Sequence, residues 1–344
     1  MKFKVPFAAL CMLSFSLTAG FAEEVASGLQ NLFVAPTPEG RQFDGYIWYP
    51  TEDRGPVTQA HGNAVWQSLP TRPDAAPKPG QKPLVLMSHG MFGNARNQAW
   101  LAQSLVAEGF VVAAVNHPGT TTFQRDPDDR RELWRRPQDI SQTLDQLLAD
   151  PTFAPLIDPD RIFMAGHSLG GWTAMTLAGA RFEKAALDRF CASDDADLVC
   201  ELFARWGIAA SETDRAAMES DLKDPRIKAI AVFDLGGTQT FSKESLAEIT
   251  TPLLVYGAPR GDEALNLDVE SRALVAALPE SNTTYLEPKR LAHFDFLGVC
   301  TDMGLAILKE EEPQDAYVCE EGTGERRDEH AQIAREVIAF FQKQ

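Results

Sequence analysis

The strongest constraint on the fold is the segment Gly-His-Ser-Leu-Gly at residues 166–170, which joins two predicted elements. The apolar run 161–165 before it is typical of a buried parallel strand, and helical spacing starts near Trp172 after it. A turn this tight tolerates only small residues at its flanks, and glycines at 166, 170 and 171 supply them. Such a turn holds the Ser168 hydroxyl at a helix N-terminus, where backbone N–H groups favour negative charge. We therefore expect Ser168 to be a nucleophile.

Apolar runs and helical stretches alternate along most of the chain. Runs typical of strands cover residues 41–49, 83–90, 110–115, 227–233, 253–256 and 283–286, and helical spacing covers 97–108, 140–149 and 328–341. This alternation predicts an α/β fold with a mostly parallel sheet covered by helices on both faces. The proline-rich segment 51–82 is predicted to be a loop, since proline cannot serve the interior of a sheet or a helix.

Two segments interrupt the alternation. Residues 124–136 carry dense charges of both signs, and we predict a solvated excursion there. Residues 181–224 have helical spacing and no obvious strand. We interpret them as a helical lid inserted into one α/β domain that spans residues 23–344.

The charge balance narrows the range of partners. The chain has 344 residues with 49 Asp and Glu against 32 Lys and Arg, a net charge of −17. Nucleic acid and anionic membranes would repel such a protein, so we expect no nucleic-acid partner. The sequence contains no dinucleotide-binding or phosphate-binding glycine motif and no zinc-binding pattern, so we expect no cofactor and no metal.

The N-terminus has the order of a secretory signal peptide. Lys2 and Lys4 precede an apolar run at residues 5–17, and small residues lead to Ala22. The run is shorter than the roughly 20 residues that a transmembrane helix needs. We expect a signal peptide at residues 1–22, and a mature protein that is exported, periplasmic or secreted, without stable membrane insertion.

Four cysteines remain after Cys11 is removed with this peptide: Cys191, Cys200, Cys300 and Cys319. In an oxidising compartment they allow three pairings. The local pairing, Cys191 with Cys200 and Cys300 with Cys319, is the most economical.

Ser168 with its flanking residues resembles the nucleophile elbow of the α/β-hydrolases. The pattern from Ser88-His89-Gly90, through the elbow, to residues 293–296 is similar to bacterial dienelactone-hydrolase-like proteins and platelet-activating-factor acetylhydrolases. The resemblance implies an α/β-hydrolase fold and a catalytic triad in the chain order serine, acid, histidine. True dienelactone hydrolases carry a cysteine nucleophile where this chain has Ser168.

Attack on an ester carbonyl produces an oxyanion, which needs two prearranged N–H donors. The first is expected from Leu169, the residue after the nucleophile. The resemblance implies that Met91, in the loop after the run 83–90, provides the second.

The base of the triad must be a histidine, and the chain has six. His293 follows the last predicted strand, as the chain order requires, and is expected to take the proton from Ser168 and pass it to the leaving group. The other five occupy segments that do not suit this role: His61, His89, His117, His167 and His330.

Two aspartates compete for the role of acid. Asp234 directly follows the run 227–233, from whose end platelet-activating-factor acetylhydrolases draw their acid. Asp262 follows the run 253–256, the usual place in the fold. Neighbouring strands lie only about 4.8 Å apart, so either carboxylate can reach the imidazole. We favour Asp234, with Asp262 as the alternative.

These residues together predict a serine hydrolase that cleaves small-molecule or lipid-like carboxylic esters through an acyl-enzyme on Ser168. An acyltransferase using the same triad and a catalytically inactive relative that binds a ligand are the alternatives. Four aromatic residues near the predicted site either line an acyl pocket or belong to the core: Phe92, Trp172, Phe294 and Phe296.

Overall fold

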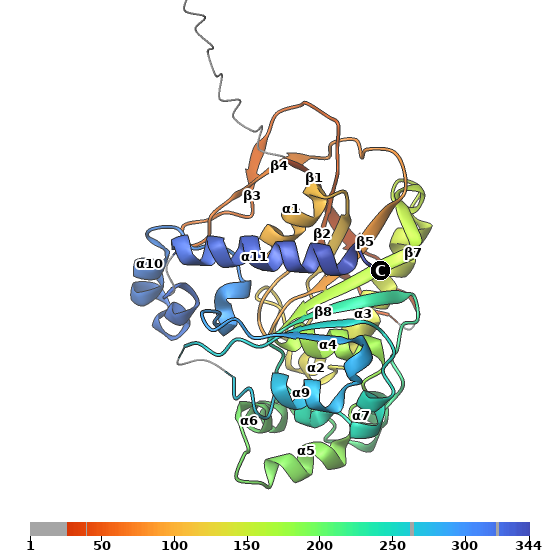
Figure 1. Ribbon diagram of the computed structural model, residues 1–344, viewed down its shortest axis with the longest axis vertical. Coiled ribbons are helices and arrows are strands. Elements are labelled where there is room, and N and C mark those ends of the chain that lie inside the picture. Colours follow the sequence, from red (N-terminus) through yellow and green to blue (C-terminus); the bar gives the residue numbers. More distant parts are fainter. Residues whose placement is uncertain (1–25, 39, 262–264, 321–322) are drawn as a thin grey trace, which may run out of the picture.

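The computed structural model describes residues 26–38, 40–261, 265–320 and 323–344. A ten-stranded sheet runs through these residues in the order β10-β9-β8-β7-β5-β6-β2-β1-β4-β3 (Figure 1). The six strands from β10 to β6 are parallel to one another, and β1 is parallel to β4. Strand β2 is antiparallel to both of its neighbours, and β3 is antiparallel to β4. The expected α/β fold with a mostly parallel sheet is confirmed.

The strands are β1 (Ser27–Val34), β2 (Phe43–Tyr49), β3 (Thr58–Ala60), β4 (Leu69–Pro73), β5 (Lys82–Ser88), β6 (Val111–Val115), β7 (Ile157–His167), β8 (Ile227–Phe233), β9 (Leu253–Tyr256) and β10 (Thr283–Leu286). The α-helices are α1 (Ala99–Ala107), α2 (Pro127–Arg131), α3 (Arg135–Ala149), α4 (Leu169–Ala178), α5 (Lys184–Cys191), α6 (Leu198–Trp206), α7 (Glu212–Met218), α8 (Lys243–Ala247), α9 (Ser271–Ala277), α10 (Gly304–Glu311) and α11 (Thr323–Phe341). The short 3₁₀ helices are η1 (Ala154–Leu156), η2 (Thr238–Thr240), η3 (Glu280–Asn282), η4 (His293–Phe296) and η5 (Pro313–Cys319).

The core consists of two apolar layers, one on each face of the sheet. Leu84 and Leu86 of β5 pack in one layer with residues of α3 and α4. Val85 and Met87 of the same strand pack in the other layer, with residues of α1 and α11. Because both faces are covered, a central strand must be apolar at every position, which explains the continuous runs in the sequence.

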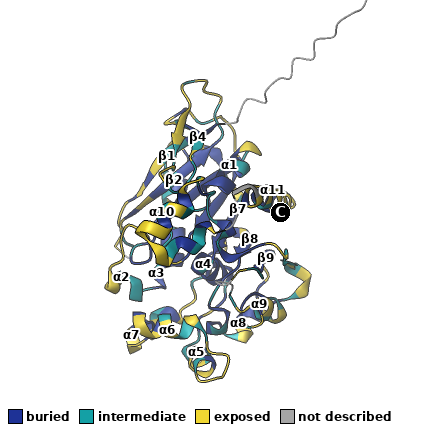
Figure 2. Cartoon of the chain, turned by 90° about the vertical axis from the view of Figure 1, so that its left-hand side faces the viewer, coloured by how far each residue is buried: buried dark blue, intermediate teal, exposed yellow. Residues whose placement is uncertain are grey.

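Three helices follow α4 in place of a strand. Helices α5, α6 and α7 lie together at the lower end of the molecule (Figures 1 and 2). A disulfide joins Cys191 at the end of α5 to Cys200 in α6, with 5.5 Å between their Cα atoms. A second disulfide joins Cys300 to Cys319 at the end of η5. The local pairing expected from the sequence is confirmed.

The prediction of a loop over residues 51–82 is wrong in part, because this segment contains β3 and β4. Pro70 and Pro73 both lie within β4, a strand of five residues next to the three-residue edge strand β3. Proline lacks an N–H group, which short strands at a sheet edge tolerate better than central strands do. The prolines therefore indicate short strands at the edge of the sheet, not a segment without strands.

The prediction of a solvated excursion over residues 124–136 is also wrong in part. Asp126 caps α2 by accepting a hydrogen bond from the Asp128 N–H, and Pro127 suits the first turn. Helix α3 begins at Arg135, earlier than expected, and Arg136 is buried with 1% of its surface exposed.

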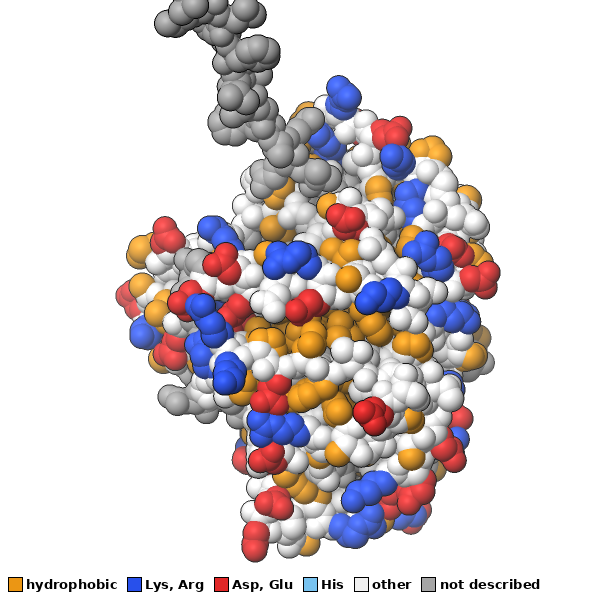
Figure 3. Space-filling model, viewed as in Figure 1, with side chains coloured by type: hydrophobic (Ala, Val, Ile, Leu, Met, Phe, Trp, Pro, Cys, Tyr) orange, Lys and Arg blue, Asp and Glu red, His pale blue; other side chains and the backbone are white. Residues whose placement is uncertain are grey.

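Charged side chains of both signs are scattered over the face shown in Figure 3, and apolar side chains gather in a band across its middle. Among the described residues, no helix combines the length and the apolarity that crossing a bilayer requires. The predicted signal peptide, residues 1–22, lies outside the described residues.

Candidate active site

The turn between β7 and α4 places Ser168 in a strained backbone conformation. Its φ is 54° and its ψ is −121°, and α4 starts at the next residue. The Ser168 N–H donates to the Phe233 carbonyl, 2.9 Å away, which ties the turn to the end of β8. A Cβ atom on Gly166 would collide with the backbone of Gly170, and one on Gly170 would collide with the carbonyl of Ser88. The two glycines are thus required by close backbone approach.

Asp234 and His293 are in direct contact. Asp234 directly follows β8 with a φ of 43°, and its N–H donates to the Tyr256 carbonyl of the neighbouring β9 at 2.9 Å. Its fully buried carboxylate accepts hydrogen bonds from the Ala258 N–H at 2.9 Å and from Nδ1 of His293 at 2.7 Å. Nε2 of His293 is then the nitrogen that can accept a proton. The alternative acid, Asp262, lies outside the described residues.

Neutral side chains hold the backbone around His293. Nε2 of His167 donates to the His293 carbonyl at 2.7 Å, and Nε2 of His330 donates to the Asp295 carbonyl at 2.7 Å. Burial lowers the pKa of His167 well below its usual value and lowers the pKa of His330 to about 3. Both imidazoles therefore serve as uncharged hydrogen-bond donors. The indole of Trp100 stacks on His330 with 3.7 Å between ring centroids and donates to the Phe296 carbonyl at 3.0 Å.

The carboxylate of Asp295, which is fully buried, provides a second set of contacts for the same segment. It accepts from the Ala292 N–H at 2.8 Å and from the guanidinium groups of Arg260 and Arg326, each at 3.2 Å. The segment that carries His293 is thus fixed on both sides of the histidine.

Leu169 and Met91 both line the cavity that contains Ser168. Leu169 is the first residue of α4, where an N–H group has no acceptor within the helix. The carbonyl of the Gly90–Met91 peptide accepts from Nδ1 of His89 at 2.7 Å and from the Gly93 N–H at 3.1 Å. These two bonds fix the orientation of the peptide to which the Met91 N–H belongs.

The tautomer of His89 follows from its contacts. Nδ1 must carry the proton because its partner is a carbonyl, and Nε2 accepts from the His117 N–H at 3.1 Å. Burial, followed by the nearby Arg136 charge, lowers the pKa of His89 well below its usual value. His89 is therefore a neutral support of the loop that contains Met91.

Arg136 lies in the charged segment 124–136, and its sequence context did not indicate a functional role. Its guanidinium donates to the His89 carbonyl, to Oγ of Ser88 at 3.1 Å, and to the hydroxyls of Thr120 and Thr173 at 2.6 and 3.0 Å. Burial lowers the pKa of Arg136 to about 9, against the opposing effect of Asp139. The group fixes the end of β5, from which the Met91 loop starts.

Ser88, His117 and Asp139 form a buried array with the atom order of a catalytic triad. His117 Nδ1 donates to Asp139 at 2.8 Å, and His117 Nε2 lies 2.9 Å from Oγ of Ser88. Arg41 donates twice to the same carboxylate, at 2.8 and 3.0 Å. All three residues of the array are buried and none lines the cavity, so we interpret this array as structural support.

The cavity has a volume of about 750 Å³ and is lined by Ser168, His293, Met91 and Leu169. Five residues of α6 contribute to its apolar wall: Leu198, Val199, Leu202, Phe203 and Trp206. The four aromatic candidates separate into two groups. Phe92 and Phe294 line the cavity, whereas Trp172 and Phe296 are buried in the core.

Glu270 is a buried acid that the sequence did not indicate. Its carboxylate accepts from the N–H groups of Gly237 and Thr238, at 2.8 to 2.9 Å, in the loop that follows Asp234. It is also hydrogen-bonded to Asp197, the residue that caps α6 and lines the cavity. Burial, with a smaller contribution from the Asp197 charge, raises the pKa of Glu270 to about 8, against the opposing effect of the hydrogen bonds from Gly237 and Thr238.

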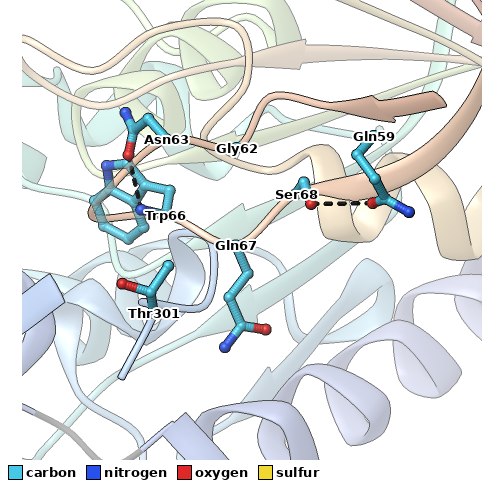
Figure 4. Close-up of a pocket in the computed structure, with 7 residues that line it drawn as sticks. All are labelled: Gln59, Gly62, Asn63, Trp66, Gln67, Ser68 and Thr301. Atoms are coloured by element: carbon cyan, nitrogen blue, oxygen red, sulfur yellow. Dashed lines mark hydrogen bonds between the residues drawn. The ribbon is translucent and has the colours of Figure 1, made fainter. Parts of the chain in front are cut away.

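A second, more open depression of about 550 Å³ lies beside the edge strands (Figure 4). Its lining is mainly polar and includes Gln59, Asn63, Ser68 and Thr301. Ser68 donates to the Gln59 side chain at 3.0 Å. The depression contains none of the candidate catalytic residues.

Comparisons with known proteins identify the family. Residues 84–336 match the model of the alpha/beta hydrolase family. The chain is 33% identical to cutinase est2 of Thermobifida alba over 99 residues, which cover 28% of this chain and 30% of the cutinase. It is 35% identical to lipase 1 of Moraxella sp. (strain TA144) over 82 residues, which cover 24% of this chain and 23% of the lipase. The matched segments thus span less than a third of these relatives' lengths.

A solved structure, the ferulic acid esterase from Streptomyces cinnamoneus, shares the fold over nearly the whole chain. The TM-score is 0.61 at 20% identity, and the alignment covers 94% of this chain and 92% of the esterase. The ten-stranded sheet, the strained turn at Ser168 and the family match lead to one conclusion: the chain belongs to the α/β-hydrolase family.

Proposed function

We propose that this protein hydrolyses carboxylic esters, with Ser168 as nucleophile, His293 as general base and Asp234 as the acid of the triad. The observation that carries the proposal is the 2.7 Å hydrogen bond between Asp234 and Nδ1 of His293. His293 and the strained Ser168 line the same cavity. The choice of Asp234 is also supported by its place directly after β8, since platelet-activating-factor acetylhydrolases draw their acid from that strand end.

The proposed reaction has two steps. His293 accepts the Ser168 proton as Oγ attacks the ester carbonyl, and it then donates this proton to the leaving alcohol. The N–H groups of Met91 and Leu169 stabilise the oxyanion. Water activated by His293 then attacks the acyl-enzyme, which releases the carboxylic acid and restores Ser168.

The comparisons support the reaction class. The two named relatives are a cutinase and a lipase, and the structure that shares the fold is a ferulic acid esterase. An apolar cavity of about 750 Å³ is of the size that small-molecule ligands occupy. We infer small or lipid-like esters as substrates.

Two organisational features belong to the same proposal. The segment 181–224 acts as a lid on one domain spanning residues 23–344, since α6 forms a wall of the cavity. We infer that the protein is exported after removal of residues 1–22. The two disulfides support this inference, because disulfides form and persist in oxidising compartments.

A series of 4-nitrophenyl esters of increasing acyl length tests the proposal. Purified protein is expected to hydrolyse at least the short members, and Ser168→Ala is expected to reduce kcat by about 10⁴-fold or more. Absence of hydrolysis by folded protein across the whole series would contradict the proposed function.

A further inference from the structure

Three arginines near the cavity lack the ion pairs that most other described arginines of this acidic chain make. Arg96, Arg125 and Arg130 make no ion pair with any residue that the structure describes. By contrast, the neighbouring Arg131 and Arg135 are paired with acidic side chains. On a chain with a net charge of −17, a cluster of uncompensated cations is unexpected.

Each of the three guanidinium groups lies over an aromatic ring. Arg125 and Arg130 lie 4.5 and 5.4 Å from the ring centroid of Phe92, and Arg130 lies 5.7 Å from that of Trp206. Arg96 lies 5.0 Å from the ring centroid of Phe123. We call these three arginines and three rings the arginine wall.

The arginine wall borders the cavity that contains Ser168 and His293. Its three rings line the cavity, as do Arg96 and Arg125. Phe92 directly follows Met91, so the wall begins beside the proposed oxyanion donor. A guanidinium stacked on a ring keeps the N–H donors at its edge available for a carboxylate. Nε of Arg130 is buried and has no hydrogen-bond partner among the described residues.

Neighbouring acidic groups are engaged elsewhere or stand on other elements. Asp126 caps α2, and Asp129 accepts from Gln124 and Arg41. Three further acids line the cavity: Asp197, Glu312 and Asp315. Asp197 caps α6 at the end opposite Trp206, whereas Glu312 and Asp315 belong to η5 and its N-cap, which contribute nothing to the arginine wall. The Asp197 carboxylate is hydrogen-bonded to Glu270. The arginine wall therefore retains a positive charge toward the cavity.

We propose that the arginine wall binds a free carboxylate of the substrate, so that the preferred substrates are esters that also carry a carboxylate group. The inference rests on the proposed function. Hydrolysis proceeds as described above. The ester C–O bond breaks, and the alcohol leaves with the proton from His293. Water then attacks the acyl-enzyme, which releases the carboxylic acid and restores Ser168. The second carboxylate takes no part in the chemistry and serves only in binding.

The experiment compares esters in pairs that differ only in this carboxylate. Mono(4-nitrophenyl) adipate carries it on the acyl part, and 4-acetoxybenzoate carries it on the leaving group. The methyl esters of the two compounds are the neutral partners. The measured quantity is the ratio of kcat/KM for the charged ester to that for its neutral partner, after subtraction of the uncatalysed rate.

The wild type is expected to give a ratio of about ten or more in at least one pair, with the effect in KM. That pair identifies which part of the substrate carries the carboxylate. Arg125→Gln and Arg96→Gln are each expected to lower the ratio severalfold, and added salt is expected to lower it in the wild type. The control is Arg335→Gln, which removes the same charge from an exposed position of α11 and is expected to leave the ratio unchanged.

Two results would overturn the inference: a wild-type ratio near one in both pairs, or a ratio in Arg96→Gln and Arg125→Gln that is as high as in the wild type. In either case, hydrolysis of the neutral esters would still support the proposed function. Failure of the wild type to hydrolyse any of the four esters would instead contradict the proposed function itself.

Discussion

Oδ2 of Asp234 lies 2.7 Å from Nδ1 of His293, although 59 positions separate the two residues in the chain. The contact joins the end of β8 to the start of η4 and fixes the tautomer of His293. With Nδ1 protonated, Nε2 is free to act as a base toward the hydroxyl of Ser168. This relationship makes the choice of acid testable.

The first prediction concerns the two candidate acids. Asp234→Asn removes the acceptor that holds the Nδ1–H tautomer, so kcat for 4-nitrophenyl butyrate should fall by about 10⁴-fold. Asp262→Asn is the matched control, and its kcat should stay within about twofold of the wild type. A large loss confined to Asp262→Asn would show that the acid has been assigned wrongly.

The two disulfides should differ in their effect on activity. The disulfide between Cys300 and Cys319 spans 19 positions and follows the His293 segment. The disulfide between Cys191 and Cys200, which joins α5 to α6, spans 9 positions. By chain entropy each contributes about 3 kcal/mol to the free energy of unfolding. Replacing both Cys300 and Cys319 by serine should lower Tm and kcat. Replacing Cys191 and Cys200 should lower Tm with a smaller effect on kcat.

Reduction of the unmodified protein provides an independent check of this prediction. Dithiothreitol should lower the activity without unfolding the sheet, as followed by circular dichroism. Full activity together with four titratable thiols contradicts the role given to the second disulfide.

Glu270 should make the stability depend on pH. Burial raises its pKa in the folded protein to about 8, above the ordinary 4.5, so the folded state retains a proton that the unfolded state releases. Stability must then decrease as the pH rises from 4.5 to 8, by at most about 1.4 kcal/mol per pH unit for one group. Above pH 8 this contribution becomes constant.

The comparison with Glu270→Gln isolates this effect, because the amide resembles the protonated acid and does not titrate. The free energy of unfolding of the wild type minus that of the variant should fall between pH 5 and pH 8, as measured by urea denaturation. A difference that is constant or increases over this interval rules out the assigned protonation.

Arg136 should be important for both stability and activity. Arg136→Met leaves the His89 carbonyl and three hydroxyls without their buried donor, which should cost about 3–5 kcal/mol. The Tm should fall by about 10 °C. The neighbouring Arg135→Met removes a partly exposed guanidinium that pairs with Glu132, an interaction worth at most about 1 kcal/mol, and serves as the control. Equal Tm values for the two variants contradict the role of Arg136.

Much of the central sheet was predictable from the sequence. The bounds of β8 and β9 agree with the apolar runs at 227–233 and 253–256, because strands covered on both faces are largely apolar. The bounds of β10 also agree with the run at 283–286, although β10 is an edge strand without a buried residue. The turn at Ser168 was predictable because its glycines are dictated by backbone contacts within a few residues.

Features that depend on distant partners were not predictable. The burial of Arg136 arises from Ser88, Thr120 and Thr173, which lie in three other parts of the chain. One signal was present: Arg136 lies four residues before Ile140, which is on the buried face of α3 with Leu144 and Leu147. Glu270 gave no such signal, because its burial depends on the loop after Asp234 and on α6.

Covalent labelling of Ser168 tests the central claim most directly. After incubation with a fluorophosphonate, intact-mass and peptide mass spectrometry should locate one adduct on Ser168, with parallel loss of 4-nitrophenyl butyrate hydrolysis. Ser168→Ala should be unlabelled and inactive while retaining the wild-type Tm within a few degrees. An adduct on another residue, or hydrolysis that persists in folded Ser168→Ala, would contradict the assignment of Ser168 as the nucleophile.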